Sequence, residues 1–71
     1  MKFETNKMYK NMYKDQNTAF HVDEIIEQKV GKDILLDVTW YQLTSDGRYV
    51  TVGVSGEFAI PQESKWYYLE V

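Results

Sequence analysis

The stretch that decides the fold is Ile34-Leu35-Leu36-Asp37-Val38-Thr39-Trp40-Tyr41, in which the even positions are apolar. From Asp37 onward the odd positions are polar or amphipathic, and this period of two is typical of a strand with one buried face. The stretch Tyr49-Val50-Thr51-Val52-Gly53-Val54-Ser55 repeats the pattern, with β-branched valines at the even positions. Two such strands close together in the chain predict a β-hairpin.

The register of this hairpin decides the type of its turn. A two-residue loop would send the two apolar sets to opposite faces, although directly opposed residues share a face. A three-residue loop, Ser45-Asp46-Gly47, avoids this conflict, and Gly47 supplies the left-handed residue of a type I turn with a G1 bulge. The pairs expected from this loop are Trp40 with Val52, Val38 with Val54, and Tyr41 with Thr51. We therefore expect the three valines to face the core.

The other strands follow from shorter patterns. Ala19 to Asp23 alternates, and the parity then shifts so that Ile25 or Ile26 faces inward, as at a β-bulge. Glu57 to Ile60 alternates too. The remaining segments are a 3₁₀ turn near residues 61–64, a last strand over residues 65–70, and residues 7–13, which suit a strand or a helix and for which we favour the strand.

Five or six short strands in 71 residues hide their edges best by closing into a small barrel. Gly53 and Gly56, inside one predicted strand, would supply the bending that closure needs. The order of Lys7 to Asn11, Phe20-His21-Val22, Asp37 to Trp40, Phe58 to Pro61 and a closing aromatic strand resembles the small SH3-like barrels common among bacteriophage accessory proteins. The resemblance implies an all-β fold, mostly β, with a binding role, and it assigns no site.

Length and composition indicate a small single-domain protein without disulfide bonds. With 71 residues and no cysteine, it is expected to form a single domain, residues 1–71, without disulfides or thiolate-held metal. The amino terminus has no signal-peptide core, and the longest aliphatic run is Ile34-Leu35-Leu36. We therefore expect a cytoplasmic protein that does not cross a membrane.

Catalytic chemistry finds little support in the sequence. The single histidine, His21, has the parity opposite to Phe20 and Val22, so it is expected to face solvent. Nucleophilic catalysis needs a hydroxyl or thiol beside a held base, and no glycine-rich phosphate loop is present. The carboxylates Asp23 and Glu24 read as parts of solvated strand faces. The sequence predicts no enzyme, no cofactor and no metal site.

Charge bears on nucleic-acid binding. Eight Lys and Arg against eleven Asp and Glu give a net charge of −3, which argues against binding a phosphate backbone. The lysines gather near the amino terminus. A single-stranded nucleic-acid-binding protein is therefore the alternative function, with tyrosines stacking on bases and Lys7, Lys10 and Lys14 following the backbone.

Aromatic residues are unusually frequent in this sequence, at eleven of 71 residues. The predicted register leaves Tyr41, Leu43 and Tyr49 on the outer face, with Leu43 opposite Tyr49, unless the amino-terminal segment folds over them. Trp66 and Tyr68 join this binding surface, although both parities of the last strand carry aromatics and its buried face stays open. The sequence predicts a protein-binding module, such as a phage-encoded modulator or inhibitor of a host enzyme or defence complex. A homodimer through an open edge strand is the third possibility.

Overall fold

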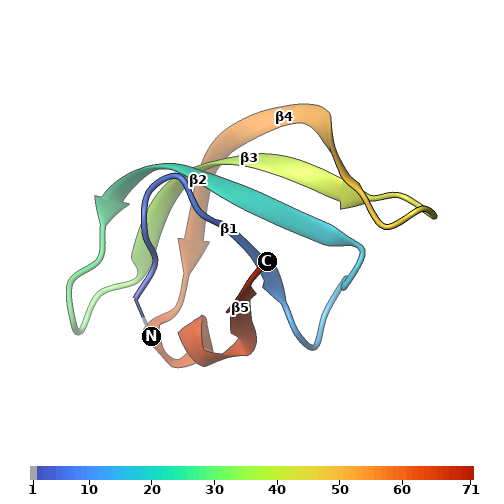
Figure 1. Ribbon diagram of the computed structural model, residues 1–71. Helices are drawn as coiled ribbons and strands as arrows, with labels where there is room; N and C mark the ends of the chain where they lie inside the picture. The colour runs from blue at the N-terminus through green and yellow to red at the C-terminus, as the bar shows by residue number, and fades with distance from the viewer. Residues whose placement is uncertain (1) are drawn as a thin grey trace.

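Five antiparallel strands and one short helix make up the computed structural model, which describes residues 2–71 (Figure 1). The elements are β1 (Met8–Asn11), β2 (Thr18–Glu27), β3 (Ile34–Leu43), β4 (Tyr49–Ile60), the 3₁₀ helix η1 (Gln62–Tyr67) and β5 (Tyr68–Glu70). The strands form one sheet in the order β4-β3-β2-β1-β5. The expected mostly-β fold is confirmed.

The turn between β3 and β4 is the predicted three-residue loop. Leu43 pairs with Tyr49, and Tyr41 pairs with Thr51. The N–H of Thr44 donates to the carbonyl of Arg48 at 2.7 Å, which closes the loop. Gly47 has a φ of 86°, as the left-handed position of a G1 bulge requires.

Beyond this turn β4 contains a bulge that the alternation did not predict. Tyr41 pairs with Thr51 and Thr39 pairs with Ser55, so that Trp40 alone faces the segment 52–54. Gly53 lies in the middle of that segment with a φ of 75°, a conformation that glycine adopts without strain. The expected pairs of Trp40 with Val52 and Val38 with Val54 are therefore wrong, and Val38 pairs with Gly56 instead.

The valines of β4 do not join the core. Val50, Val52 and Val54 are 44%, 47% and 55% exposed, so the prediction that they face inward is wrong. The bulge arches β4 away from a straight course along β3, as Figure 1 shows at the top of the molecule. The packed interior reaches only as far as Trp40 along β3. The distal half of the hairpin therefore projects past the core.

Two other strand predictions are confirmed and one is corrected. The register of β2 shifts after Val22, and Ile25 packs against the core while Ile26 is exposed. Residues 8–11 form a strand rather than a helix. The expected 3₁₀ turn is present but extends to Tyr67, so the last strand covers only Tyr68–Glu70 because the preceding residues remain in η1.

Aromatic rings fill much of the interior. The rings of Trp40, Phe58 and Tyr68 each pack edge-on against Phe20, with centroids 5.3 to 5.7 Å apart. Phe3 is 1% exposed and contacts Phe20 and Tyr9. The buried residues are Phe3, Tyr9, Ala19, Phe20, Val22, Ile34, Leu36, Val38 and Ile60. The amino-terminal segment therefore anchors in the core through Phe3.

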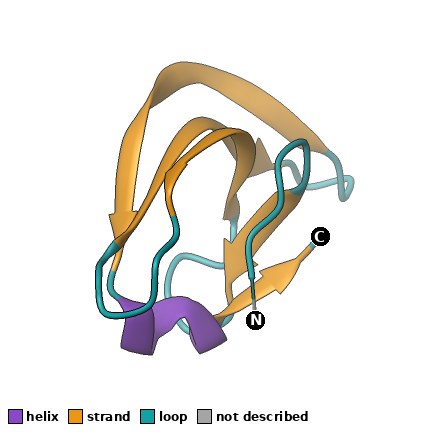
Figure 2. Cartoon of the chain, turned by 90° about the vertical axis from the view of Figure 1, so that its left-hand side faces the viewer, coloured by secondary structure: helices purple, strands orange, loops and turns teal. Residues whose placement is uncertain are grey.

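The sheet curls strongly but its two ends do not pair. Within residues 2–71, β4 bonds only to β3 and β5 only to β1, so a closed barrel is not confirmed. Figure 2 shows this curvature, with η1 lying across the base of the opening. No helix in the described part of the chain is long and apolar enough to span a membrane.

Candidate functional site: an aromatic groove at the open edge of the sheet

Two adjoining hollows form one groove between β4 and the β1–β5 pair. Their volumes are about 660 and 190 Å³. Four residues line both hollows: Asn11, Lys14, Phe58 and Tyr68. The larger hollow adds Tyr13, Ala59, Pro61, Ser64 and Tyr67, and the smaller adds Asp15, Thr18, Phe20 and Trp40. We call this feature the aromatic groove.

The groove runs along the free edge of β4. Phe58 and Ala59 are neighbours in a strand, so their side chains point to opposite faces of the sheet. Both nevertheless line the larger hollow. In residues 2–71 β4 pairs with β3 alone, so its other side is an edge where backbone groups lack a partner strand.

The deep side of the groove is built from the aromatic core. Trp40 and Phe58 are in edge contact with centroids 5.0 Å apart, and Phe58 lies 6.4 Å from Tyr68. All three are only partly buried and pack against the fully buried cluster. Because their rings are held by core contacts, the groove is preformed.

Two tyrosines form the outer rim. Tyr13 and Tyr67 are in edge-to-face contact with centroids 5.4 Å apart. They are 72% and 47% exposed, respectively. The N–H of Met12 donates to the carbonyl of Tyr67 at 2.8 Å, which ties the loop after β1 to the end of η1. Two segments far apart in the chain are thus joined at the rim.

Asn11 orders the loop that carries the rim. Its Oδ1 accepts hydrogen bonds from the N–H groups of Tyr13 and Lys14, at 2.8 and 3.0 Å. This side-chain bond to the following backbone is the Asx-turn arrangement that favours Asn at such positions. It places Lys14 on the groove wall, and in residues 2–71 Lys14 forms no ion pair.

The predicted surface residues fall into two groups. Tyr41, Leu43 and Tyr49 lie together on the outer face of the hairpin as expected, and each is half-buried. Tyr68 lines the groove, which decides the side of the last strand that faces inward. Trp66 is 63% exposed on η1, outside the groove, with the Nζ of Lys65 5.3 Å from its ring centroid. The structure therefore does not bring the five predicted binding residues into one patch.

The three lysines of the nucleic-acid alternative are dispersed. The Nζ of Lys7 lies 3.6 Å from a carboxylate oxygen of Glu70. Lys10 sits in β1 opposite Leu69, and only Lys14 lines the groove. The aromatic groove therefore has a single basic residue beside its rings.

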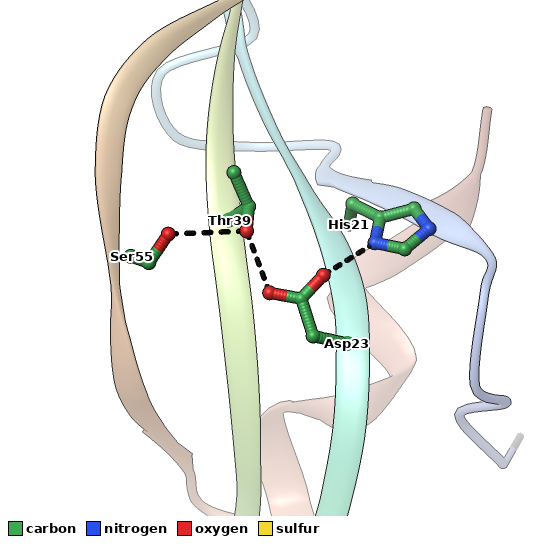
Figure 3. Close-up of polar contacts among 4 residues, drawn as sticks. All are labelled: His21, Asp23, Thr39 and Ser55. Carbon is green, nitrogen blue, oxygen red and sulfur yellow. Dashed lines mark hydrogen bonds and ion pairs between the residues drawn. The ribbon is translucent and has the colours of Figure 1, made fainter.

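A polar cluster lies on the outer face of β2, β3 and β4 (Figure 3). Asp23 accepts from the hydroxyl of Thr39 at 2.6 Å and contacts Nδ1 of His21 at 2.7 Å. The Thr39 and Ser55 hydroxyl oxygens are 3.2 Å apart. The hydrogen bond from Thr39, and then that from His21, hold the pKa of Asp23 below its usual value. The carboxylate stands between the imidazole and both hydroxyls, so His21 is not placed to take a proton from Ser55 or Thr39.

Sequence reasoning missed most of the groove. Tyr13, Phe58, Tyr67 and Trp40 were not assigned to a site, because each belongs to a different part of the chain and only the tertiary fold joins them. One usable signal was the pair of adjacent aromatics in the last segment, Tyr67-Tyr68, which leaves one ring free when the other is buried. A second and weaker sequence signal was Asn11, a residue that favours turns, two positions before Tyr13.

Comparison with known proteins supplies no family. No protein-family model matches the chain, and no curated protein or solved structure shows a significant match. Among the described residues, no group of three or more His, Asp or Glu side chains is placed to hold a metal ion.

Proposed function

We propose that this chain is a non-enzymatic protein-binding module that holds a segment of a partner protein in the aromatic groove. The observation that carries the proposal is the exposed pair Tyr13 and Tyr67 above a preformed aromatic floor. Tyrosine offers a large contact area with little conformational entropy to lose, and it is enriched at protein interfaces. The groove thus has the composition of a recognition site.

The same proposal includes the finer fold and setting expected from the sequence. We regard the curled sheet as a partly open SH3-like barrel whose seam is the groove. We also propose that the protein acts inside the cell, as a phage-encoded modulator of a host enzyme or defence complex. These parts rest on the sequence resemblance and on composition alone.

Charge favours protein over nucleic acid as the partner. The groove presents one lysine, Lys14, and one carboxylate, Asp15, and the chain as a whole carries −3. Binding to single strands combines stacking aromatics with a basic track along the backbone. Lys7 is paired with Glu70, so such a track is missing beside these rings.

Selection from a displayed library of random peptides tests this function. We expect enriched peptides that bind the purified protein and lose at least about tenfold in affinity to a Tyr13→Ala/Tyr67→Ala variant, since a tyrosine at the energetic centre of an interface contributes about 2 kcal/mol or more. Trp66→Ala is the matched control, because Trp66 is an equally exposed aromatic outside the groove. Circular dichroism checks that both variants fold. Failure to enrich any peptide, or equal loss in the control, would contradict the proposal.

A single-tryptophan protein gives a direct readout of the groove. Trp40 lines the smaller hollow, and the chain contains only one other tryptophan, Trp66. In a Trp66→Phe background, a bound peptide is expected to shift the emission of Trp40 to shorter wavelength as water leaves the ring. A peptide that binds without changing Trp40 emission does not occupy the proposed site.

A further inference from the structure

We infer that the segment bound in the aromatic groove is extended along the free edge of β4 and carries a carboxylate that faces Lys14. This inference rests on the proposed function and specifies the conformation and charge of the partner's segment. It depends on two independent features of the groove, its backbone edge and its single cation.

The first feature is the unpaired edge of β4. Among residues 2–71, β4 bonds to β3 alone, so its other side has N–H and C=O groups without a partner strand. Phe58 and Ala59, two consecutive residues of this edge strand, line the larger hollow. An extended peptide matches such an edge because its own backbone repeats donors and acceptors at the same spacing.

The opposite wall decides where the segment lies. Asn11 and Tyr68, which pair with each other across β1 and β5, line both hollows. The bound segment would therefore run in the gap between the two ends of the sheet, as an added strand beside β4. Alternate side chains of that strand would rest on Trp40 and Phe58, which favours apolar residues at every second position.

The second feature is the charge of Lys14. It is the only charged residue that lines the larger hollow. Within the described chain its ammonium group has no ion-pair partner, while its backbone N–H is fixed by Asn11. Asp15 lines only the smaller hollow. A carboxylate on the segment would complement Lys14, which lines both hollows.

The experiment uses the tightest peptide from the random library. Its acidic residues are changed one at a time to lysine, and each peptide is titrated against wild type, Lys14→Glu and the control Lys32→Glu, an exposed lysine outside the groove. We expect Lys14→Glu to weaken binding about tenfold and one acid-to-lysine peptide to do the same. Combining these two changes should recover most of the affinity, whereas Lys32→Glu should change little.

The extended conformation is tested on the same peptide by N-methylation of each backbone amide. Methyl groups at alternate positions should weaken binding about tenfold, since a strand turns only every second amide toward its neighbour. Of the two neighbours Phe58 and Ala59, only the one whose N–H faces the free edge of β4 should exchange more slowly in the complex.

The outcomes of these experiments distinguish failure of the extended, acidic segment from failure of the protein-binding function. If the peptide depends on Tyr13 and Tyr67 but shows neither the charge exchange nor the alternate N-methyl pattern, this inference is overturned and the proposed function stands. If no peptide depends on those tyrosines, the proposed function itself fails. Binding of an unstructured dT oligonucleotide that Tyr13→Ala/Tyr67→Ala abolishes, or a dimer that the same variant dissolves, would identify a different occupant and overturn the inference.

Discussion

Gln28 binds the backbone of Phe3 twice, across a separation of 25 residues. Its Oε1 accepts from the N–H of Phe3 at 2.7 Å, and its Nε2 donates to the carbonyl of the same residue at 3.1 Å. This side chain, one residue after β2, therefore fixes the amino-terminal segment in the position that buries the Phe3 ring.

We expect Phe3→Ala to destabilise the protein by about 3–5 kcal/mol, because a fully buried ring is removed from the core. Gln28→Ala should cost about 1–3 kcal/mol, since two backbone groups lose their partner. Urea unfolding measures both. Gln42→Ala, an exposed glutamine on β3, is the control and should leave the unfolding midpoint within error. If Phe3→Ala leaves the unfolding midpoint unchanged, the amino-terminal segment contributes nothing to stability.

Gly53 and Gly56 allow a comparison of backbone strain at two open positions. A Cβ added at either glycine meets no atom within 4 Å, but only Gly53 has a positive φ, 75°. We expect Gly53→Ala to destabilise by about 1–2 kcal/mol. Gly56→Ala should be neutral or stabilising by up to about 1 kcal/mol, because it restricts the unfolded chain. Equal losses in thermal denaturation would argue against a strained bulge at Gly53.

This bulge also shows where prediction from sequence reaches its limit. The three-residue loop was predictable because register and Gly47 agreed on one solution. Gly53 permits a left-handed conformation but does not require it, so alternation alone kept the valines on the core face. Phe3 was equally hard to place, as one apolar residue in a polar segment has no period. The groove joins Tyr13 to Tyr67, and no local pattern reports a contact over such a distance in the chain.

Tyr9 gives a prediction at alkaline pH. Its ring is 2% exposed and its Oη accepts from the N–H of Glu4 at 2.9 Å. Burial raises the pKa of Tyr9 above the ordinary value of 10.0. The stability that the protonated Tyr9 phenol contributes to the fold is therefore fully present below about pH 10, the ordinary pKa. It is lost as the pH rises through the folded-state pKa. Tyr9→Phe should reduce this loss in urea unfolding between neutral and alkaline pH, with Tyr13→Phe as the exposed control.

Asp23 gives the corresponding prediction in acid. Because the Thr39 hydroxyl and then His21 stabilise its carboxylate, the pKa of Asp23 lies below its usual value of 3.8. Its contribution to stability is present above that value and is lost as the pH falls through the folded-state pKa. Thr39→Val should raise the pKa of Asp23, measured by NMR titration of the side-chain carboxyl carbon. Thr51→Val, on the neighbouring strand, should leave it unchanged. An unaltered Asp23 titration in Thr39→Val would rule out this hydrogen bond in solution.

The free edge of β4 predicts self-association at high concentration. Residues 49–56 contain no charge and no proline, and Val50, Val52 and Val54 are exposed along them. Edge strands of this kind tend to pair with copies of themselves, and charged side chains oppose this pairing. Residues 49–56 carry no charge apart from their neighbours, so the bulge at Gly53 is their single protection. Light scattering over a concentration series should therefore show dimers of the wild type. Val52→Lys should shift the population to monomer, while Val30→Lys, at a 96% exposed position before Gly31, should not. If both lysine variants and the wild type remain monomeric throughout, the bulge alone is enough to protect this edge.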